Sequence, residues 1–137
     1  MTATTTIAEK LKARVATVFP ATGFAAGVTP EHIAEGRSIP AGLQPPCVLI
    51  LAGDGAIEDG TLSRRQRFQL VLIDRLKGHG NDRATSVWTQ FDLLQAPFPP
   101  DGVTVDGILF LPESFRILAC TDSRAAACLT VAAVVPT

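Results

Sequence analysis

The stretch Gln66–Leu76, QRFQLVLIDRL, decides the fold. Side chains alternate between the two faces of a β-strand, so every second residue of this stretch points the same way. Its apolar residues therefore form two sets, one on each face: Phe68, Leu70 and Leu72 against Val71 and Ile73. A strand that is apolar on both faces in its middle and polar at its ends is typical of the centre of a sheet. We expect helices to cover one face, and the other face to be partly covered.

The composition indicates one folded domain over residues 1–137. The chain is 47% hydrophobic and 18% charged, which is unlike a disordered protein, and its length allows a real hydrophobic core. The formal net charge is −1, so no overall field draws the protein to nucleic acid or to an anionic membrane. Its apolar runs are too short to span a bilayer. We expect no membrane partner and no sequence-specific nucleic-acid partner.

The three cysteines are odd in number and lack C-x-x-C spacing. Reduced thiols in a cytoplasmic protein are the preferred interpretation. A C-terminal hairpin that turns about Arg124 would place Cys120 opposite Cys128.

An amphipathic helix is predicted near the N-terminus, at about 7–19. Thr6 and Glu9 have the spacing of a capping box, in which each side chain reaches a free N–H of the first turn. A second helix of one or two turns is predicted after Thr29, because threonine is a good cap and Pro30 suits the first helical position.

A longer helix is predicted at about 83–95, with Asp82 as its cap. One side of it carries an apolar stripe at helical spacing: Ala84, Val87, Trp88, Phe91 and Leu94. We expect this helix to pack on the same face of the sheet as the first one. Trp88 and Phe91 are the expected anchors in the core.

Glycines and prolines divide the remainder into strands and connections. A short strand is predicted at 47–52, and a hairpin of 115–121 and 126–135 ends the chain. The segment 53–65 has three glycines and three acids. It is longer than a hairpin turn requires, so we predict a long inter-strand loop. The segment 36–46 is predicted to be an extended, Pro-rich surface segment.

These elements predict an α+β fold with the order helix, strand, strand, helix, strand, strand. The expected architecture is a two-layer sandwich: a mainly antiparallel sheet of four to five strands with two helices on one face. The last strand, 126–135, is long and uncharged. Exposed sheet edges usually carry charge. We therefore expect the edge of this strand to be covered, and a neighbouring subunit is one candidate for covering it.

The sequence contains no motif for catalysis or for cofactor binding. The segment 78–80 is a Gly-His-Gly turn that lacks the rest of a phosphate-binding motif. His32 and His79 have no partner histidine at metal-ligand spacing, and no G-x-S-x-G is present. Three acids in one predicted loop lack the spacing of a calcium site: Asp54, Glu58 and Asp59. We predict no catalytic, cofactor or metal residues and expect a protein that is not an enzyme.

The arginines before the central strand have two interpretations. They are solubilising charges that pair with nearby acids for little net stability, or they form a basic spot for an acidic neighbouring subunit or a phosphate backbone. The second interpretation gives a candidate subunit interface: Asp54, Glu58, Asp59, Arg64, Arg65 and Arg67.

The order of elements resembles the tail-terminator, or tail-completion, proteins of long-tailed bacteriophages and prophages, notably the Mu-like and lambda-like groups. The resemblance covers about 6–135 and rests on length and element order, without an invariant motif. Its parts are TIAEKLKARVATVF, the Pro-rich segment, PCVLILA, the Gly/Asp-rich segment, RRQRFQLVLIDR, ATSVWTQFDLL and the C-terminal strands.

The resemblance implies a structural protein that forms a ring, expected to be a hexamer, on the tail tube. Such a ring ends tube polymerisation and presents a surface to the head. The implied partners are other copies of the chain, a tail tube protein and a head–tail connector protein. The implied location is the bacterial host cytoplasm during assembly and then the virion tail. Assembly contacts of this family use the long inter-strand loop, here 53–65.

Two alternatives remain open. One is another assembly protein of a phage or contractile system, such as a head-completion or tube part. The other is a small ligand-binding domain or an enzyme without a recognisable motif.

Overall fold

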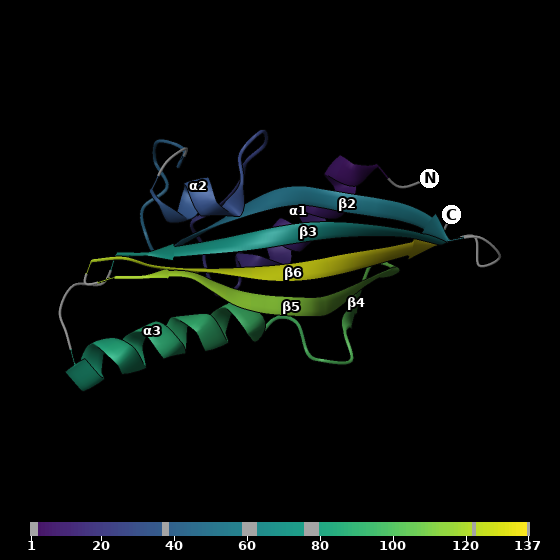
Figure 1. Cartoon of the computed structure of the whole chain (residues 1–137). Coiled ribbons are helices and arrows are strands. Elements are labelled where there is room, and N and C mark those ends of the chain that lie inside the picture. The colour runs from purple at the N-terminus through teal and green to yellow at the C-terminus, as the bar shows by residue number, and fades with distance from the viewer. Residues whose placement is uncertain (1–2, 37–38, 59–62, 76–79, 122, 137) are drawn as a thin grey trace.

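The computed structural model describes the chain except for residues 1–2, 37–38, 59–62, 76–79, 122 and 137. In the described part, six strands form one mixed sheet in the order β1-β2-β3-β6-β5-β4, and three helices lie against it (Figure 1). The predicted α+β class is confirmed, with at least one more strand than predicted and with the short helix after Thr29 added to the two helices of the predicted sandwich. The elements are α1 (Thr4–Val15), β1 (Thr22–Phe24), α2 (Pro30–Ala34), β2 (Cys47–Glu58), β3 (Ser63–Asp74), α3 (Gly80–Gln95), β4 (Val103–Val105), β5 (Ile108–Cys120) and β6 (Ala125–Pro136).

Strand β3 lies inside the sheet, antiparallel to β2 on one side and to β6 on the other. The two faces of the predicted strand are confirmed. Leu70 and Leu72 belong to the core cluster that contains residues of α1 and α3, whereas Val71 and Ile73 belong to the cluster under α2. All four side chains are fully buried.

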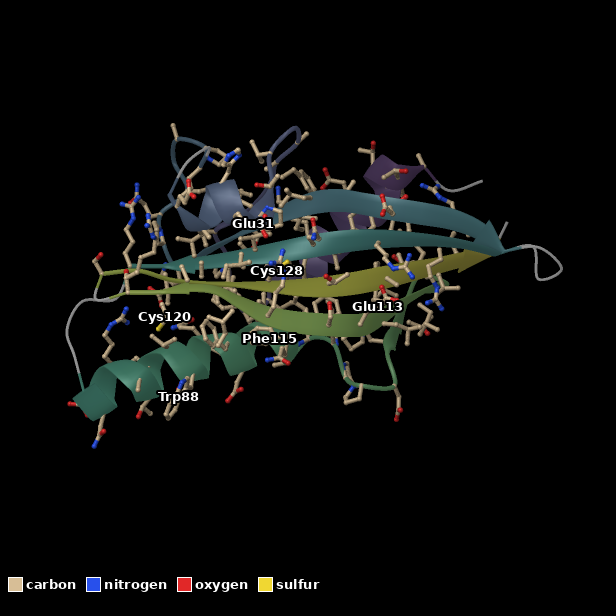
Figure 2. All side chains as sticks on the ribbon, viewed as in Figure 1. Glu31, Trp88, Glu113, Phe115, Cys120 and Cys128 are labelled. Carbon is tan, nitrogen blue, oxygen red and sulfur yellow. The ribbon has the colours of Figure 1, made fainter. Side chains whose placement is uncertain are left out.

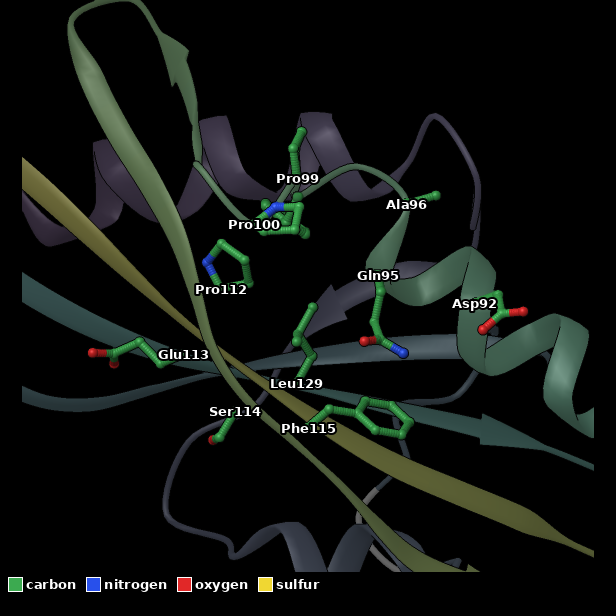
Figure 3. Close-up of a pocket in the computed structure, with 11 residues that line it drawn as sticks. Asp92, Gln95, Ala96, Pro99, Pro100, Pro112, Glu113, Ser114, Phe115 and Leu129 are labelled. Atoms are coloured by element: carbon green, nitrogen blue, oxygen red, sulfur yellow. The ribbon is translucent and has the colours of Figure 1, made fainter.

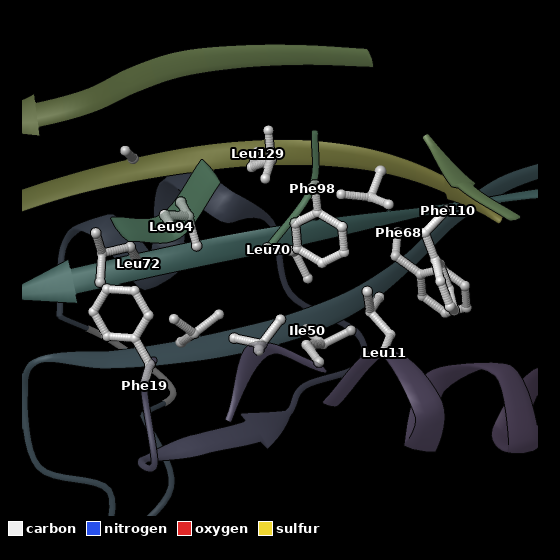
Figure 4. Packing of buried hydrophobic residues seen from close by; sticks show 14 of the residues in the cluster. Leu11, Phe19, Ile50, Phe68, Leu70, Leu72, Leu94, Phe98, Phe110 and Leu129 are labelled. Atoms are coloured by element: carbon white, nitrogen blue, oxygen red, sulfur yellow. The ribbon is translucent and has the colours of Figure 1, made fainter. Parts of the chain in front are cut away.

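Helices α1 and α3 cover one face, as predicted. Each contributes three buried side chains at helical spacing: Ile7, Leu11 and Val15 from α1, and Val87, Phe91 and Leu94 from α3. Between them and the sheet lies a core of leucines and phenylalanines, including Phe19, Phe68 and Phe98 (Figure 4). This face holds most of the buried bulky side chains.

The starts of the helices differ in how well the sequence predicted them. Helix α1 begins at Thr4 with Ala3 as its N-cap, and no side chain caps it. The predicted capping box is therefore wrong, because Thr6 already lies within the first turn. Helix α2 begins as predicted: the Thr29 hydroxyl accepts a hydrogen bond from the N–H of His32 at 3.2 Å.

Helix α2 lies on the opposite face of the sheet from α1 and α3. Its Ile33 packs against a second cluster built on β2, β3 and β6. The described part of the Pro-rich segment, 39–46, has no helix or strand, and its Ile39 and Leu43 pack against the same cluster. A five-residue helix and an irregular segment thus cover one end of this face.

Strand β6 is covered on both edges by its own chain. It pairs with β3 over its whole length and with β5 on the other side. The absence of charge on 126–135 therefore reflects a central strand, and a neighbouring subunit is not needed to cover it. The hairpin register also differs from the prediction: Cys120 faces Ala125, and Arg116 faces Cys128. Bulges in β5 shift the pairing.

The predicted loop 53–65 is wrong, because most of it is strand. Strand β2 continues to Glu58 and β3 begins at Ser63, with an irregularity between Ala52 and Gly55. A Cβ atom on Gly55 would lie 2.7 Å from the Oε1 of Gln66 and 3.3 Å from the backbone oxygen of Arg65, so a larger residue would displace the Gln66 amide. Gly53 and Gly55 lie at a β-bulge, where close approach of two backbones favours glycine.

The prediction that Trp88 anchors the core is also wrong. Its side chain is 62% exposed. Helix α3 contacts the core through Val87, Phe91 and Leu94, and the neighbouring Trp88 lies on the side away from the sheet (Figure 2).

Candidate subunit interface

Two of the predicted interface arginines are held by one carboxylate of their own chain. Glu113 on β5 accepts from Arg67 Nε at 2.7 Å and from Arg65 at 3.3 Å. Its hydrogen bond and its charge raise the pKa of Arg67 above the ordinary value. These ion pairs reach from β3 to β5 across the intervening strand β6. Arg65 and Arg67 are therefore part of the subunit's own surface structure.

The residue beneath this bridge is Ala132. It pairs with Arg67 on one side and with Leu111 on the other. Ala132 is fully buried, yet it belongs to neither of the two apolar clusters. We infer that the stems of the bridging side chains cover it, as long charged side chains do over small apolar residues.

Arg64 points to the opposite face from Arg65, because neighbours alternate along a strand. Its guanidinium donates to the hydroxyl of Thr4 at the start of α1 and to Gln66 Oε1 at 3.3 Å. The structure thus separates two residues that the sequence suggested would act together. Changing both to glutamate would alter two faces at once.

The acids of the candidate interface are spread along the end of β2. Asp54 is exposed in the bulge, and its charge contributes to the raised pKa of Arg67. Glu58 ends β2, and Asp59 lies outside the described residues. The described part of the chain therefore brings together Asp54, Arg65 and Arg67, and it does not join Arg64 to them.

Among the described residues, three large apolar side chains are exposed on separate elements, and the sequence did not single them out as a surface. Phe24 on β1 is 39% exposed, Trp88 on α3 is 62% exposed and Ile117 on β5 is 57% exposed. The ammonium of Lys12 on α1 lies 5.2 Å from the centre of the Phe24 ring. The buried residues of α3 form a stripe that is narrower than the predicted one, and Trp88 lies beside it.

The sheet is open along those parts of β2 and β5 that extend past the short outer strands β1 and β4. Strand β4 pairs only with 108–110 of β5, and β1 pairs only with 48–50 of β2. No other described strand pairs with the outer edges of β5 and β2. Both strands carry bulges, and β5 also carries Pro112 and Glu113 at its open part. Such features discourage strand addition, so we expect side chains to make any contact at these edges.

Two hollows lie on this surface. The larger has a volume of about 600 Å³ and lies between the end of α3, Pro99–Pro100 and the bulge of β5 (Figure 3). Phe115 lies on the side facing Gln95, whereas Glu113 points away from it. The smaller has a volume of about 200 Å³ and is called the α1 pocket here. Its lining residues come from α1, β1, the residue after β1, β2 and β3: Thr4, Thr5, Ala8, Phe24, Ala25, Ile50, Ala52 and Phe68.

The described residues contain no group of three or more histidine, cysteine or acidic side chains that could hold a metal ion. Cys47 and Cys128 are buried, and burial raises the pKa of both thiols, whereas Cys120 is exposed. No described helix is long and apolar enough to cross a membrane.

No protein-family model matches the sequence, and no curated protein matches it. Several solved structures are similar, and one of them, of a protein whose name describes no function, matches 96% of this chain and 91% of its own. The identity is 15% and the TM-score is 0.49. A similarity of that size carries no argument about what this chain does.

Proposed function

We propose that the protein is a structural tail terminator, whose copies form a ring that ends a phage tail tube and offers a joining surface to the head. The observation that carries the proposal is the set of exposed apolar side chains, Phe24, Trp88 and Ile117. Single exposed apolar residues are normal on a monomer. Here, two lie on or beside open parts of the sheet and the third is a tryptophan, which is a frequent anchor of protein interfaces.

A ring needs two different patches on each subunit, because each copy contacts the next head to tail. Strand β1 is at one end of the strand order, and β5 lies next to the other end. Phe24 and Ile117 are therefore near opposite edges of the sheet. This arrangement supports a head-to-tail contact better than a two-fold dimer, which would use one patch twice.

The β2–β3 hairpin takes the place of the loop that the resemblance assigned to assembly contacts. Its strands extend to Glu58 and Ser63 at the end of the sheet where β6 also ends (Figure 1). We propose this end as the part of each subunit that faces the tail tube or the connector. A hexameric ring remains part of the proposal.

A second candidate is a ligand-binding domain. The observation in its favour is the larger hollow, whose volume of about 600 Å³ lies within the usual range of about 300–1,000 Å³ for small-molecule sites. Such sites need polar groups that converge on the ligand. Here the carboxylate of Glu113 is turned outwards to Arg67.

The test is the mass of the purified protein over a concentration series, by light scattering or native mass spectrometry, with negative-stain images of the same samples. We expect a ring with a central hole. The protein is then mixed with polymerising tail tube protein, and the tubes should stop growing and carry the ring at one end. A protein that stays monomeric alone and on tubes, and leaves tube length unchanged, contradicts the proposal.

A further inference from the structure

We propose that Trp88 of one subunit enters the α1 pocket of the next, with Asp92 beside it facing Lys12 of that next subunit. The inference rests on the proposed ring and names the contact that joins its members. It depends on three features of the described surface: the size of the pocket, the charges beside it and the positions of the two patches.

The pocket has the size of one aromatic side chain. Its volume is about 200 Å³, whereas a cavity of about 150 Å³ already binds benzene and small-molecule sites begin at about 300 Å³. Ile50 and Phe68 form buried apolar parts of its lining, and the half-exposed ring of Phe24 forms part of its rim. Trp88 is the only tryptophan of the chain. It is not among the described residues that line this pocket in its own subunit.

The charges beside the two patches are complementary. Asp92 is exposed and follows Trp88 by four residues, so the two side chains are neighbours on α3, about 6 Å apart. Lys12 follows Ala8 by four residues on α1, and its ammonium lies over the pocket's Phe24. On one subunit, Trp88 and the carboxylate of Asp92 are one helical turn apart. On the next, Ala8 of the pocket and Lys12 are also one helical turn apart.

The positions of the patches make the contact head to tail. The α1 pocket is at the β1–β2 edge of the sheet, and α3 runs below β5 at the other edge, with its first turns farther from the strands than its last (Figure 1). One subunit therefore offers the tryptophan at one side and the pocket at the other. Repetition of such a contact closes a ring or continues as a filament.

The fluorescence of Trp88 tests the contact directly, because no other tryptophan contributes. We expect its emission to move to shorter wavelength, and its quenching by acrylamide to fall, over the concentrations at which the mass rises. Trp88→Ala should raise the concentration needed for assembly by about thirtyfold or more, as expected for a central interface residue. Its circular dichroism should be unchanged, since the side chain is exposed.

A charge exchange tests the second half of the contact. Lys12→Glu and Asp92→Lys should each weaken assembly several-fold, and the double variant should recover most of the loss. Asp82→Lys is the matched control. It makes the same charge change on α3, but Asp82 is six residues before Trp88 and lies about a third of a turn away around the helix. Assembly of this control should be unchanged.

The outcomes separate this contact from the proposed function. A ring that forms while Trp88 stays as exposed as in the monomer overturns the contact and leaves the ring standing. A double charge variant as weak as the single ones overturns the pairing of Asp92 with Lys12. A protein that is monomeric alone and on tail tubes overturns both proposals.

Discussion

The two faces of the sheet bury the same strands by different means. On one face, α1 and α3 press leucines and phenylalanines against β3 and β6. On the other, the five-residue α2 and the segment 39–46 cover one end, and the ion pairs of Glu113 cross the sheet further along. Residues on the two faces can thus be equally buried, although two long helices cover one face and much shorter elements cover the other.

This difference indicates where the stability of the fold resides. Apolar burial contributes roughly 25 cal/mol per Å², so the face with the bulky side chains carries the larger share. Exposed ion pairs contribute little. The second face is covered mainly by the five-residue α2 and the segment 39–46, and we expect these short elements to adjust more readily when a side chain is changed.

The largest expected effect comes from a matched pair of substitutions, Leu72→Ala and Ile73→Ala. The two residues are isomers, adjacent in β3, fully buried and on opposite faces. Such changes cost about 2–5 kcal/mol, depending on how far the surroundings collapse into the cavity. We expect Leu72→Ala near the upper end of that range. Ile73→Ala should be near the lower end, because α2 and the segment 39–46 can move inwards.

Urea denaturation of both variants gives the free energies of unfolding to be compared. Equal losses, or a larger loss for Ile73→Ala, would mean that α2 holds its face as firmly as two long helices hold theirs. The comparison of the faces would then fail, although the fold would be unaffected.

A smaller effect is expected from Ala132→Leu. The added atoms would push against the bridge from Arg65 and Arg67 to Glu113, and overpacking costs about 1–3 kcal/mol. Adding Glu113→Ala should relieve part of this cost, because the stems above position 132 would then be free to move. Denaturation of the single and double variants measures the coupling. A cost of Ala132→Leu that is the same with and without Glu113 would mean that something other than the bridge covers Ala132.

Local periodicity predicted the parts of the fold that depend on neighbouring residues. The alternation in QRFQLVLIDRL assigned both faces of β3 correctly, and the spacing of apolar residues located α1 and α3. Thr29 and Pro30 located the start of α2, because capping is a property of a few adjacent residues. The bounds were less accurate, since α1 begins three residues earlier than predicted.

Long-range pairing was not predictable in the same way. The uncharged strand 126–135 indicated a covered edge, but only the topology shows that β3 and β5 cover it. The glycines of 53–65 indicated a loop, whereas Gly53 and Gly55 fit a bulge against Arg67 and Gln66. Trp88 fitted the apolar stripe, yet α3 buries only Val87, Phe91 and Leu94 and leaves Trp88 exposed. In the candidate interface, the sequence grouped Arg64 with Arg65, but the alternation of side chains along β3 places them on opposite faces.

The smallest expected effect concerns the end of β3, where the helix-covered face meets a charged group. Asp74 is 5% exposed, and its Oδ2 has no hydrogen-bond partner among the described residues. Burial raises the pKa of this carboxyl above the ordinary 3.8, although a hydrogen bond from the backbone of Arg75 and the charge of Arg83 act in the opposite direction. The folded protein therefore binds the proton more tightly than the unfolded chain does. The stability that this provides is present below pH 3.8 and is lost as the pH rises through the raised pKa.

Asp74→Asn removes the ionisation without changing the size of the side chain. At neutral pH we expect a gain of about 1 kcal/mol, because the buried acceptor is no longer charged. The gain should fade on acidification, since wild-type Asp74 then becomes neutral as well. Asp101→Asn, at an exposed aspartate before β4, is the control and should leave stability at neutral pH unchanged. A loss of stability in Asp74→Asn at neutral pH would show that the hydrogen bond from Arg75 and the attraction to Arg83 together outweigh burial, and that the charged form belongs to the folded state.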